Sequence, residues 1–225
     1  MLASSGGAEP VERSGRAGRG GVCSRRSRMN LAEKLVRPAT LADLDELPPG
    51  WRGEIIDGTL YAFPRPRFAH ANIEDLITAD LKNPYQRGRG GPGGWWILSE
   101  PGIQLERAPE ISPDVAGWRR ARMPVPPPPK EPITLVPDWC CEILSPRTAG
   151  YDNLVKRRFY AEIGVPHLWY VDPARRTLLV SQLEHGRWVE LGLHGRDEKV
   201  RAAPFEDVEI DLAEWWEGLD EGDEA

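Results

Sequence analysis

Two carboxylates lie inside β-prone, mostly apolar segments of this 225-residue chain, and that placement limits how the chain can fold. Asp114 belongs to the run Ile-Ser-Pro-Asp-Val-Ala, which predicts a strand over 111–116, and Glu142 belongs to a second predicted strand over 137–145. An ionised carboxylate is costly to bury unless it is paired, hydrogen-bonded or bound to a cation. Each acid therefore needs a partner, and Mg²⁺ is a good candidate because it accepts one or two protein carboxylates together with water and phosphate.

An amine follows on the next predicted element, a helix over 153–163 that ends at Gly164. Asp152, Lys156 and Tyr160 are spaced at i, i+4 and i+8, so they share one stripe of this helix. The stripe borders an apolar one, and Lys156 can therefore lean inward along its aliphatic stem. The alternative is an Asp152–Lys156 surface pair, which would contribute only about 0.2–0.5 kcal/mol. The residues alone leave both interpretations open.

The three side chains together predict the hydrolysis of a phosphodiester bond. Two neighbouring carboxylates cannot both stay ionised cheaply, and a shared Mg²⁺ removes the conflict. The metal would lower the pKa of a bound water and clamp a phosphoryl oxygen, with Asp114 and Glu142 as its ligands. Lys156 would orient that water and offset the negative charge on the phosphorus oxygens. The alternatives are an edge-strand Glu142 that faces solvent and an Asp114 that only ends a turn after Pro113.

The other segments predict an α/β fold with a mixed central β-sheet flanked by helices. His70 and Glu74 lie at i and i+4 of the longest predicted helix, as either a surface pair or part of a site. A proline-dense loop is expected over 123–132. The expected helices cover 40–47 and 68–81, and the expected strands cover 95–98, 103–105 and 167–171, with hairpins over 52–63 (turning at Asp57-Gly58) and 177–193.

The length of the chain favours one domain, over residues 29–217, between two disordered tails. The tail 1–28 is rich in Gly and Ser and carries six Arg against two Glu, and the tail 218–225 is acidic. Residues 29–205 carry 23 acidic and 23 basic side chains, so the body is neutral. Neutrality argues against a broad nucleic-acid footprint but leaves room for a local basic cleft.

Several other kinds of protein are disfavoured. The three cysteines, Cys23, Cys140 and Cys141, form neither a CxxC motif nor an even disulfide framework, which favours a reducing cytoplasm. Cys140 and Cys141 would point to opposite faces of their strand and pack in the core. No apolar run approaches the roughly 20 residues that span a bilayer, so no membrane partner is expected. Ser145 lacks a nucleophile-elbow context, and no Walker-type phosphate loop occurs.

Several of these segments together resemble the Uma family. In the N-terminal part of the chain, Glu54, Asp57-Gly58 and His70 resemble the N-terminal signature of that family. Over about residues 40–215 the chain is similar to the Uma-two group of restriction-endonuclease-like proteins in the PD-(D/E)XK nuclease superfamily. The segments that carry the similarity are Ser112-Pro113-Asp114-Val115, Cys141-Glu142-Ile143-Leu144-Ser145-Pro146, Tyr151-Asp152-Asn153-Leu154-Val155-Lys156, Tyr160, Gly164-Val165-Pro166 and Trp169-Tyr170-Val171-Asp172-Pro173.

The resemblance implies a restriction-endonuclease-like core and Mg²⁺-dependent cleavage of DNA phosphodiester bonds. Asp114 matches the Asp of the PD motif and Glu142 matches the acid of the next strand, which makes both of them metal ligands. The superfamily Lys normally stands two residues after that acid, where this chain has Leu144. In Uma-like sequences the amine comes from the following helix, and Lys156 occupies that place here.

The resemblance also implies auxiliary catalytic roles for Glu54 and His70, and it matches Asp152 to a position without an assigned role. A homodimer is expected by analogy with the fold, since one catalytic centre cuts one strand. A different class of function stays open beside the nuclease. In that alternative, a nuclease-like fold binds nucleic acid or a protein partner without cutting, which suits the neutral body and the acidic tail.

Overall fold

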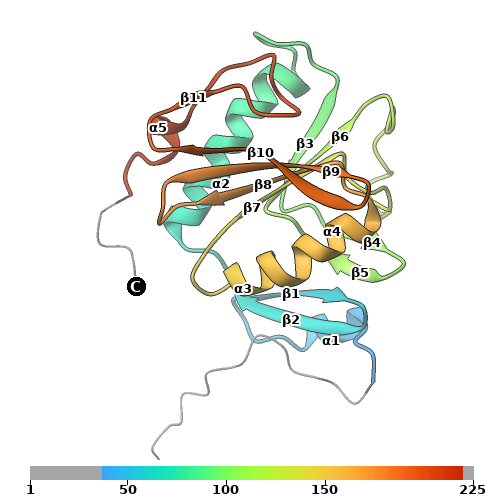
Figure 1. Ribbon diagram of the computed structural model, residues 1–225. Coiled ribbons are helices and arrows are strands. Elements are labelled where there is room, and N and C mark those ends of the chain that lie inside the picture. Colours follow the sequence, from blue (N-terminus) through green and yellow to red (C-terminus); the bar gives the residue numbers. More distant parts are fainter. Residues whose placement is uncertain (1–36, 220–225) are drawn as a thin grey trace, which may run out of the picture.

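The computed structural model describes residues 37–219, and a six-stranded sheet forms its centre (Figure 1). Only β7 and β8 run parallel, and every other neighbouring pair is antiparallel, which confirms the predicted mixed sheet. In spatial order the strands are β10 (Arg187–Gly195), β9 (Thr177–Glu184), β8 (His167–Asp172), β7 (Trp139–Ile143), β6 (Val115–Arg119) and β3 (Trp95–Ser99).

A four-stranded sheet lies beside the central one (Figure 1). Its β1–β2 hairpin turns at Asp57 and Gly58, whose φ angles of 49° and 72° are the positive values that this turn requires. The hairpin prediction is therefore confirmed. In spatial order, its strands are β2 (Thr59–Pro64), β1 (Trp51–Ile56), β5 (Ala108–Ile111) and β4 (Ile103–Leu105). Helix α1 (Leu41–Asp45) precedes β1 in the chain. A separate two-stranded sheet, β11 (Lys199–Val200) and β12 (Ile210–Asp211), follows near the C-terminal end.

Helix α2 (Phe68–Leu81) has the predicted bounds and covers one face of the central sheet. It continues into a π-helical turn, η1 (Lys82–Gln86), and packs beside the short helix α5 (Leu212–Trp215). Phe205 completes this half of the core: its ring centroid lies 4.9 Å from that of Trp139 and 5.6 Å from that of Trp169. The segment that follows β11 is therefore part of the core rather than an appendage.

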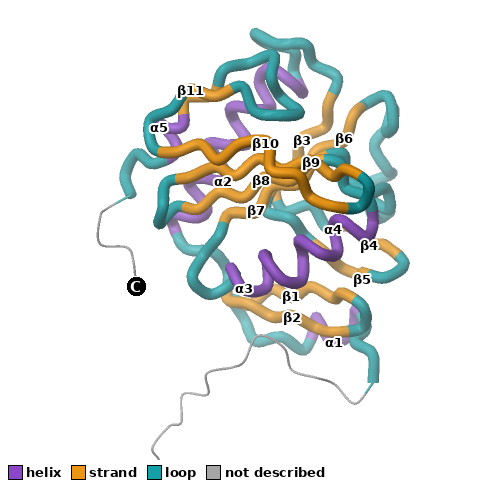
Figure 2. The backbone as a smooth tube through the Cα atoms, viewed as in Figure 1, coloured by secondary structure: helices purple, strands orange, loops and turns teal. Residues whose placement is uncertain are grey.

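The opposite face of the sheet is covered by one continuous helix, built from α3 (Ala149–Tyr151), the π-helical turn η2 (Asp152–Lys156) and α4 (Arg157–Ile163) (Figure 2). Figure 1 shows this helix between the two sheets. It ends at Gly164, with φ of 81°, as predicted. The expected start at 153 is wrong, because the helix begins four residues earlier, at Ala149.

The predicted strand over 111–116 is also wrong. Strand β5 ends at Ile111 and β6 begins at Val115, with Pro113 in between, where the missing amide hydrogen interrupts sheet pairing. Asp114 therefore lies on the connection between the two sheets, immediately before β6. The prediction for Cys140 and Cys141 is confirmed, since the two side chains enter the cores on opposite faces of β7.

The predicted tail 1–28 and most of the predicted acidic tail lie outside the described residues. At the C-terminal limit of the described part, the carbonyl of Leu219 accepts a hydrogen bond from Arg176 (3.2 Å). Between residues 37 and 219, no helix combines the length and the apolar character needed to cross a lipid bilayer.

Candidate active site

The fold brings together the three side chains that the sequence singled out. Val115 pairs with Cys141 across β6 and β7, which places Asp114 next to Glu142 at the same end of the strand pair. The backbone amide of Ile143 donates to Oδ2 of Asp114 (2.7 Å), so one strand anchors the acid of the other. Lys156 reaches the pair from η2, on the helix that crosses this face of the sheet.

Lys156 is buried at the centre of this cluster, with 2% of its side chain exposed. Its ammonium lies 3.0 Å from Oε2 of Glu142 and 3.1 Å from Oε1 of Glu54, and donates to the carbonyl of Ser112 (3.2 Å). Asp152 is buried as well. The inward orientation of Lys156 is therefore confirmed, and the alternative of an Asp152–Lys156 surface pair is wrong.

Two tyrosines complete the cluster, and the sequence had assigned a role to neither. The Tyr160 hydroxyl donates to Oε1 of Glu142 (2.5 Å), and the Tyr151 hydroxyl donates to Oε2 of Glu54 (2.8 Å). Burial raises the pKa of both tyrosines, so both keep the protons that they donate. Tyr160 lies on the same helical stripe as Lys156, and that stripe was the available signal for it.

Two basic side chains from other elements contact Asp114. Arg52 on β1 donates from Nη2 to Oδ1 (3.2 Å), and Nε2 of His70 lies 3.1 Å from the same oxygen as an ion-pair contact without hydrogen-bond alignment. Burial opposes ionisation, yet the contact with His70 and the charges of His70, Lys156 and Arg52 lower the pKa of Asp114 below its usual range. Burial also lowers the pKa of His70, but Asp114 outweighs it, so the pKa is raised. His70 thus faces the site rather than forming the surface pair with Glu74.

Acids outnumber bases in this buried cluster. Burial, reinforced by the charge of Asp114, raises the pKa of Glu74 to about 7. Burial also raises the pKa of Asp152 to about 7, against the opposing charge of Lys156. The acids are Asp114, Glu142, Glu54, Glu74 and Asp152, and the bases are Lys156, Arg52 and His70.

This donor set fits a hard divalent cation in ligand type, because carboxylate oxygens suit Mg²⁺. Within residues 37–219, no three His, Cys, Asp or Glu side chains are grouped as a ready-made metal site. Mg²⁺ does not require such a group, since one or two carboxylates and several waters satisfy it. Asp114 and Glu142 would each have to exchange a protein hydrogen-bond donor for the ion.

A cleft of about 1110 Å³ lies over the cluster, and Arg52 and His70 form part of its lining. Its walls include the segments after β7 and β8, so it opens at the carboxyl ends of the parallel strand pair, where α/β sheets commonly bind ligands. Asp114, Glu142 and Lys156 are buried and do not line the cleft, but Asp114 contacts Arg52 and His70, which do. Arg52 and His70 therefore connect the carboxylate of Asp114 to the cleft.

Comparisons with known proteins give a family and a fold. Residues 40–213 match the model of the Uma2 family, whose description reads "Putative restriction endonuclease". The chain also resembles a crystal structure from Anabaena variabilis, described as "a putative nuclease belonging to DUF820", with 20% identity, coverage of 80% of this chain and 98% of that one, and a TM-score of 0.58. At that identity the similarity establishes the fold alone. No curated protein matches the sequence.

Proposed function

The chain belongs to the Uma2 family, and on that premise we propose that it is a Mg²⁺-dependent endonuclease that hydrolyses DNA phosphodiester bonds. The observation that carries the proposal is the meeting of Asp114, Glu142 and Lys156, from three different elements, beneath one cleft. Asp114 and Glu142 would hold the metal. When bound, Mg²⁺ supplies a water of lowered pKa and a clamp on the phosphoryl oxygen.

Lys156 acts as a fixed positive charge in this proposal. Burial alone would lower its pKa, but the charges of Glu142, Glu54, Asp152 and Asp114 raise it above the ordinary value. An ammonium that stays protonated cannot accept a proton from water. It can orient the water and offset the charge that develops on the phosphorus oxygens. Glu54 positions it, since the two atoms lie 3.1 Å apart.

Arg52 and His70 have two tasks in this proposal. They contact Asp114, and as part of the cleft lining they would also contact an incoming phosphate. Within residues 37–219, the buried Nε of Arg52 has no hydrogen-bond acceptor. The Nη atoms of Arg52 already contact Glu100 and Asp114, so the guanidinium would bind a phosphate by exchanging one of these contacts.

A cleavage assay with Mg²⁺, on supercoiled plasmid and on circular single-stranded DNA, tests the proposal through two matched variants. Asp138 is buried like Asp114, accepts a backbone amide from Arg119 (2.8 Å) and pairs with Arg122 (2.8 Å), yet it lies outside the cluster. Asp114→Asn should reduce nicking by roughly a hundredfold or more, because a metal ligand contributes several kcal/mol. Asp138→Asn should nick like the wild type. Equal nicking by all three proteins would exclude the assignment.

A second function, nucleic-acid or protein binding without cleavage, is favoured by one observation. Every oxygen of Asp114 and Glu142 already contacts a protein donor, from Ile143, Arg52, Lys156 or Tyr160. If the protein binds nucleic acid or a protein without cutting, titration calorimetry should detect no Mg²⁺ binding that depends on Asp114. The nuclease requires such uptake, and the heat should disappear in Asp114→Asn.

A further inference from the structure

Arginine dominates the lining of the cleft, although the body of the chain is neutral. Among residues 37–219, Asp172 is the only acidic residue in the lining, and its carboxylate pairs with Arg175 (2.9 Å). The arginines come from β1 and from loops after β2, β7, β8 and β10, so the fold assembles them from distant parts of the sequence. They are Arg52, Arg65, Arg67, Arg147, Arg175, Arg176 and Arg196.

Within the described part of the chain, most of these arginines have no carboxylate partner. Only Arg52 and Arg175 lie within ion-pair distance of a carboxylate in the described part of the chain. Unpaired guanidinium groups repel one another, so their gathering in one concave surface costs stability unless an anion occupies it. Guanidinium also binds phosphate oxygens in a bidentate manner. The lining therefore fits a ligand with several phosphates.

Phe68 adds an aromatic surface to the same cleft. It is the first residue of α2, lines the cleft and is 78% exposed. An exposed aromatic ring beside a positively charged groove is how proteins bind single-stranded nucleic acid, with a base stacked on the ring. Bases inside a duplex already stack on their neighbours on both faces, so they offer no free face for the ring.

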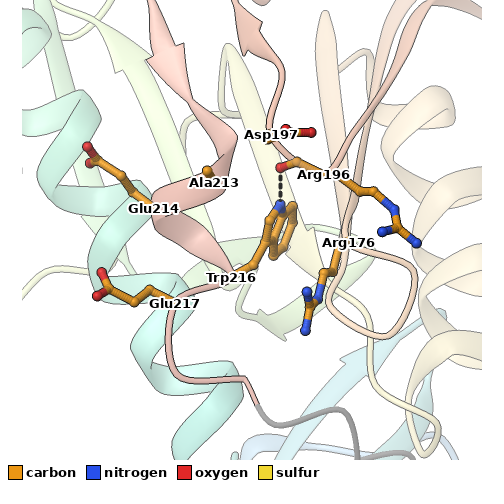
Figure 3. Close-up of a pocket in the computed structure, with 7 residues that line it drawn as sticks. All are labelled: Arg176, Arg196, Asp197, Ala213, Glu214, Trp216 and Glu217. Atoms are coloured by element: carbon orange, nitrogen blue, oxygen red, sulfur yellow. Dashed lines mark hydrogen bonds between the residues drawn. The ribbon is translucent and has the colours of Figure 1, made fainter.

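The size of the cleft favours one strand, and the basic lining has a definite end. The volume of about 1110 Å³ is close to the ~300–1,000 Å³ of small-ligand clefts and suits a few nucleotides rather than a duplex. At the far end, Arg176 and Arg196 also line a smaller pocket of about 520 Å³ (Figure 3). Their guanidinium groups lie on one side of Trp216 and the carboxylates of Glu214 and Glu217 on the other, so the basic lining ends there.

We propose that the cleft binds a single DNA strand, with its phosphates on the arginines and one base stacked on Phe68. The inference rests on the proposed nuclease function and specifies its substrate as unpaired DNA that runs over Asp114. A duplex-binding surface is the competing outcome.

Fluorescence anisotropy with a labelled oligothymidylate, in EDTA and with the full chain, measures this binding without cleavage. The cleft variant replaces three exposed arginines of the lining that have no carboxylate partner within residues 37–219: Arg65→Gln, Arg67→Gln and Arg147→Gln. The matched control replaces three exposed arginines outside the cleft: Arg87→Gln, Arg89→Gln and Arg187→Gln. The N-terminal arginines are present in both proteins, so they cancel from the comparison.

The cleft variant should bind roughly a hundredfold more weakly at 0.1 M salt, and the slope of log K against log salt should fall by about 2, because each phosphate contact on a single strand contributes about 0.7. The control should bind within about twofold of the wild type. Phe68→Ala should weaken binding about fivefold or more. The Phe68→Ala variant should keep a folded core, because the ring is mostly exposed, so weaker binding reports the loss of the ring itself.

Two results would overturn the inference: equal binding by the cleft and control variants, or a duplex of the same length bound as tightly as the single strand with no effect of Phe68→Ala. The nuclease proposal fails separately. A protein that binds through the cleft but never nicks DNA keeps the inference and loses the enzymatic function. If the protein cleaves DNA but the cleft variant binds as tightly as the control, the enzymatic function stands and the inference about the cleft is wrong.

Discussion

Replacement of Lys156 by Met tests the buried cluster most directly, since Met keeps the length of the side chain and removes its charge. Glu142 and Glu54 would then face one another without the ammonium that lies 3.0 and 3.1 Å from them. Removal of one partner from a buried ion pair typically costs about 3–5 kcal/mol. For a chain of this size that corresponds to a fall in Tm of roughly 6–20 °C.

The free energy of unfolding can be measured by urea titration with tryptophan fluorescence. Burial and the charges of Asp114, Asp152 and Glu54 raise the pKa of Glu142 even against Lys156, and removal of Lys156 raises it further. A carboxyl group whose folded pKa exceeds its unfolded value destabilises the fold as the pH rises above the unfolded value. The defect of Lys156→Met should therefore be larger at pH 8 than at pH 5.

A rescue variant distinguishes charge from packing. Glu142→Gln and Glu54→Gln, added to Lys156→Met, remove both uncompensated charges and keep acceptors for Tyr160 and Tyr151. Most of the lost stability should return. A loss below about 1 kcal/mol for Lys156→Met, or no recovery in the triple variant, would contradict a cluster held together by this ammonium.

Three further predictions concern other parts of the molecule. Burial raises the pKa of Glu74 to about 7, so ionisation of its carboxyl group costs stability. Glu74→Gln should therefore raise the free energy of unfolding above pH 7 by up to roughly 3 kcal/mol, and the gain should disappear below about pH 4.5. Urea titrations at each pH measure the difference. Burial also raises the pKa of Cys140 and Cys141, so in a Cys23→Ser background neither thiol should react with Ellman's reagent until urea unfolds the chain. Phe205→Ala should cost about 3–5 kcal/mol in the same titrations, since its ring is fully buried among aromatic rings, and an unchanged midpoint would show that the C-terminal segment is dispensable.

Local patterns in the sequence were enough to predict helix α2, the Asp57-Gly58 hairpin and the end of the helix at Gly164. Each of these depends on residues a few positions apart, where periodicity, turn geometry and backbone freedom act directly. Pro113 shows the limit of such patterns, because the apolar run around it resembled one strand and proved to be the link between two sheets.

Within the candidate site, the sequence was enough to single out Asp114, Glu142 and Lys156, because an ionised group in or beside an apolar run is costly to bury without a partner. Only the tertiary structure decided the partners. Arg52 pairs with Asp114 across 62 residues of sequence, and Tyr151 donates to Glu54 across 97. The packing of two sheets against one helix, rather than any local pattern, sets which distant side chains meet. For the same reason the arginine-lined cleft has no signature in the sequence of residues 29–205, where acidic and basic side chains are equal in number.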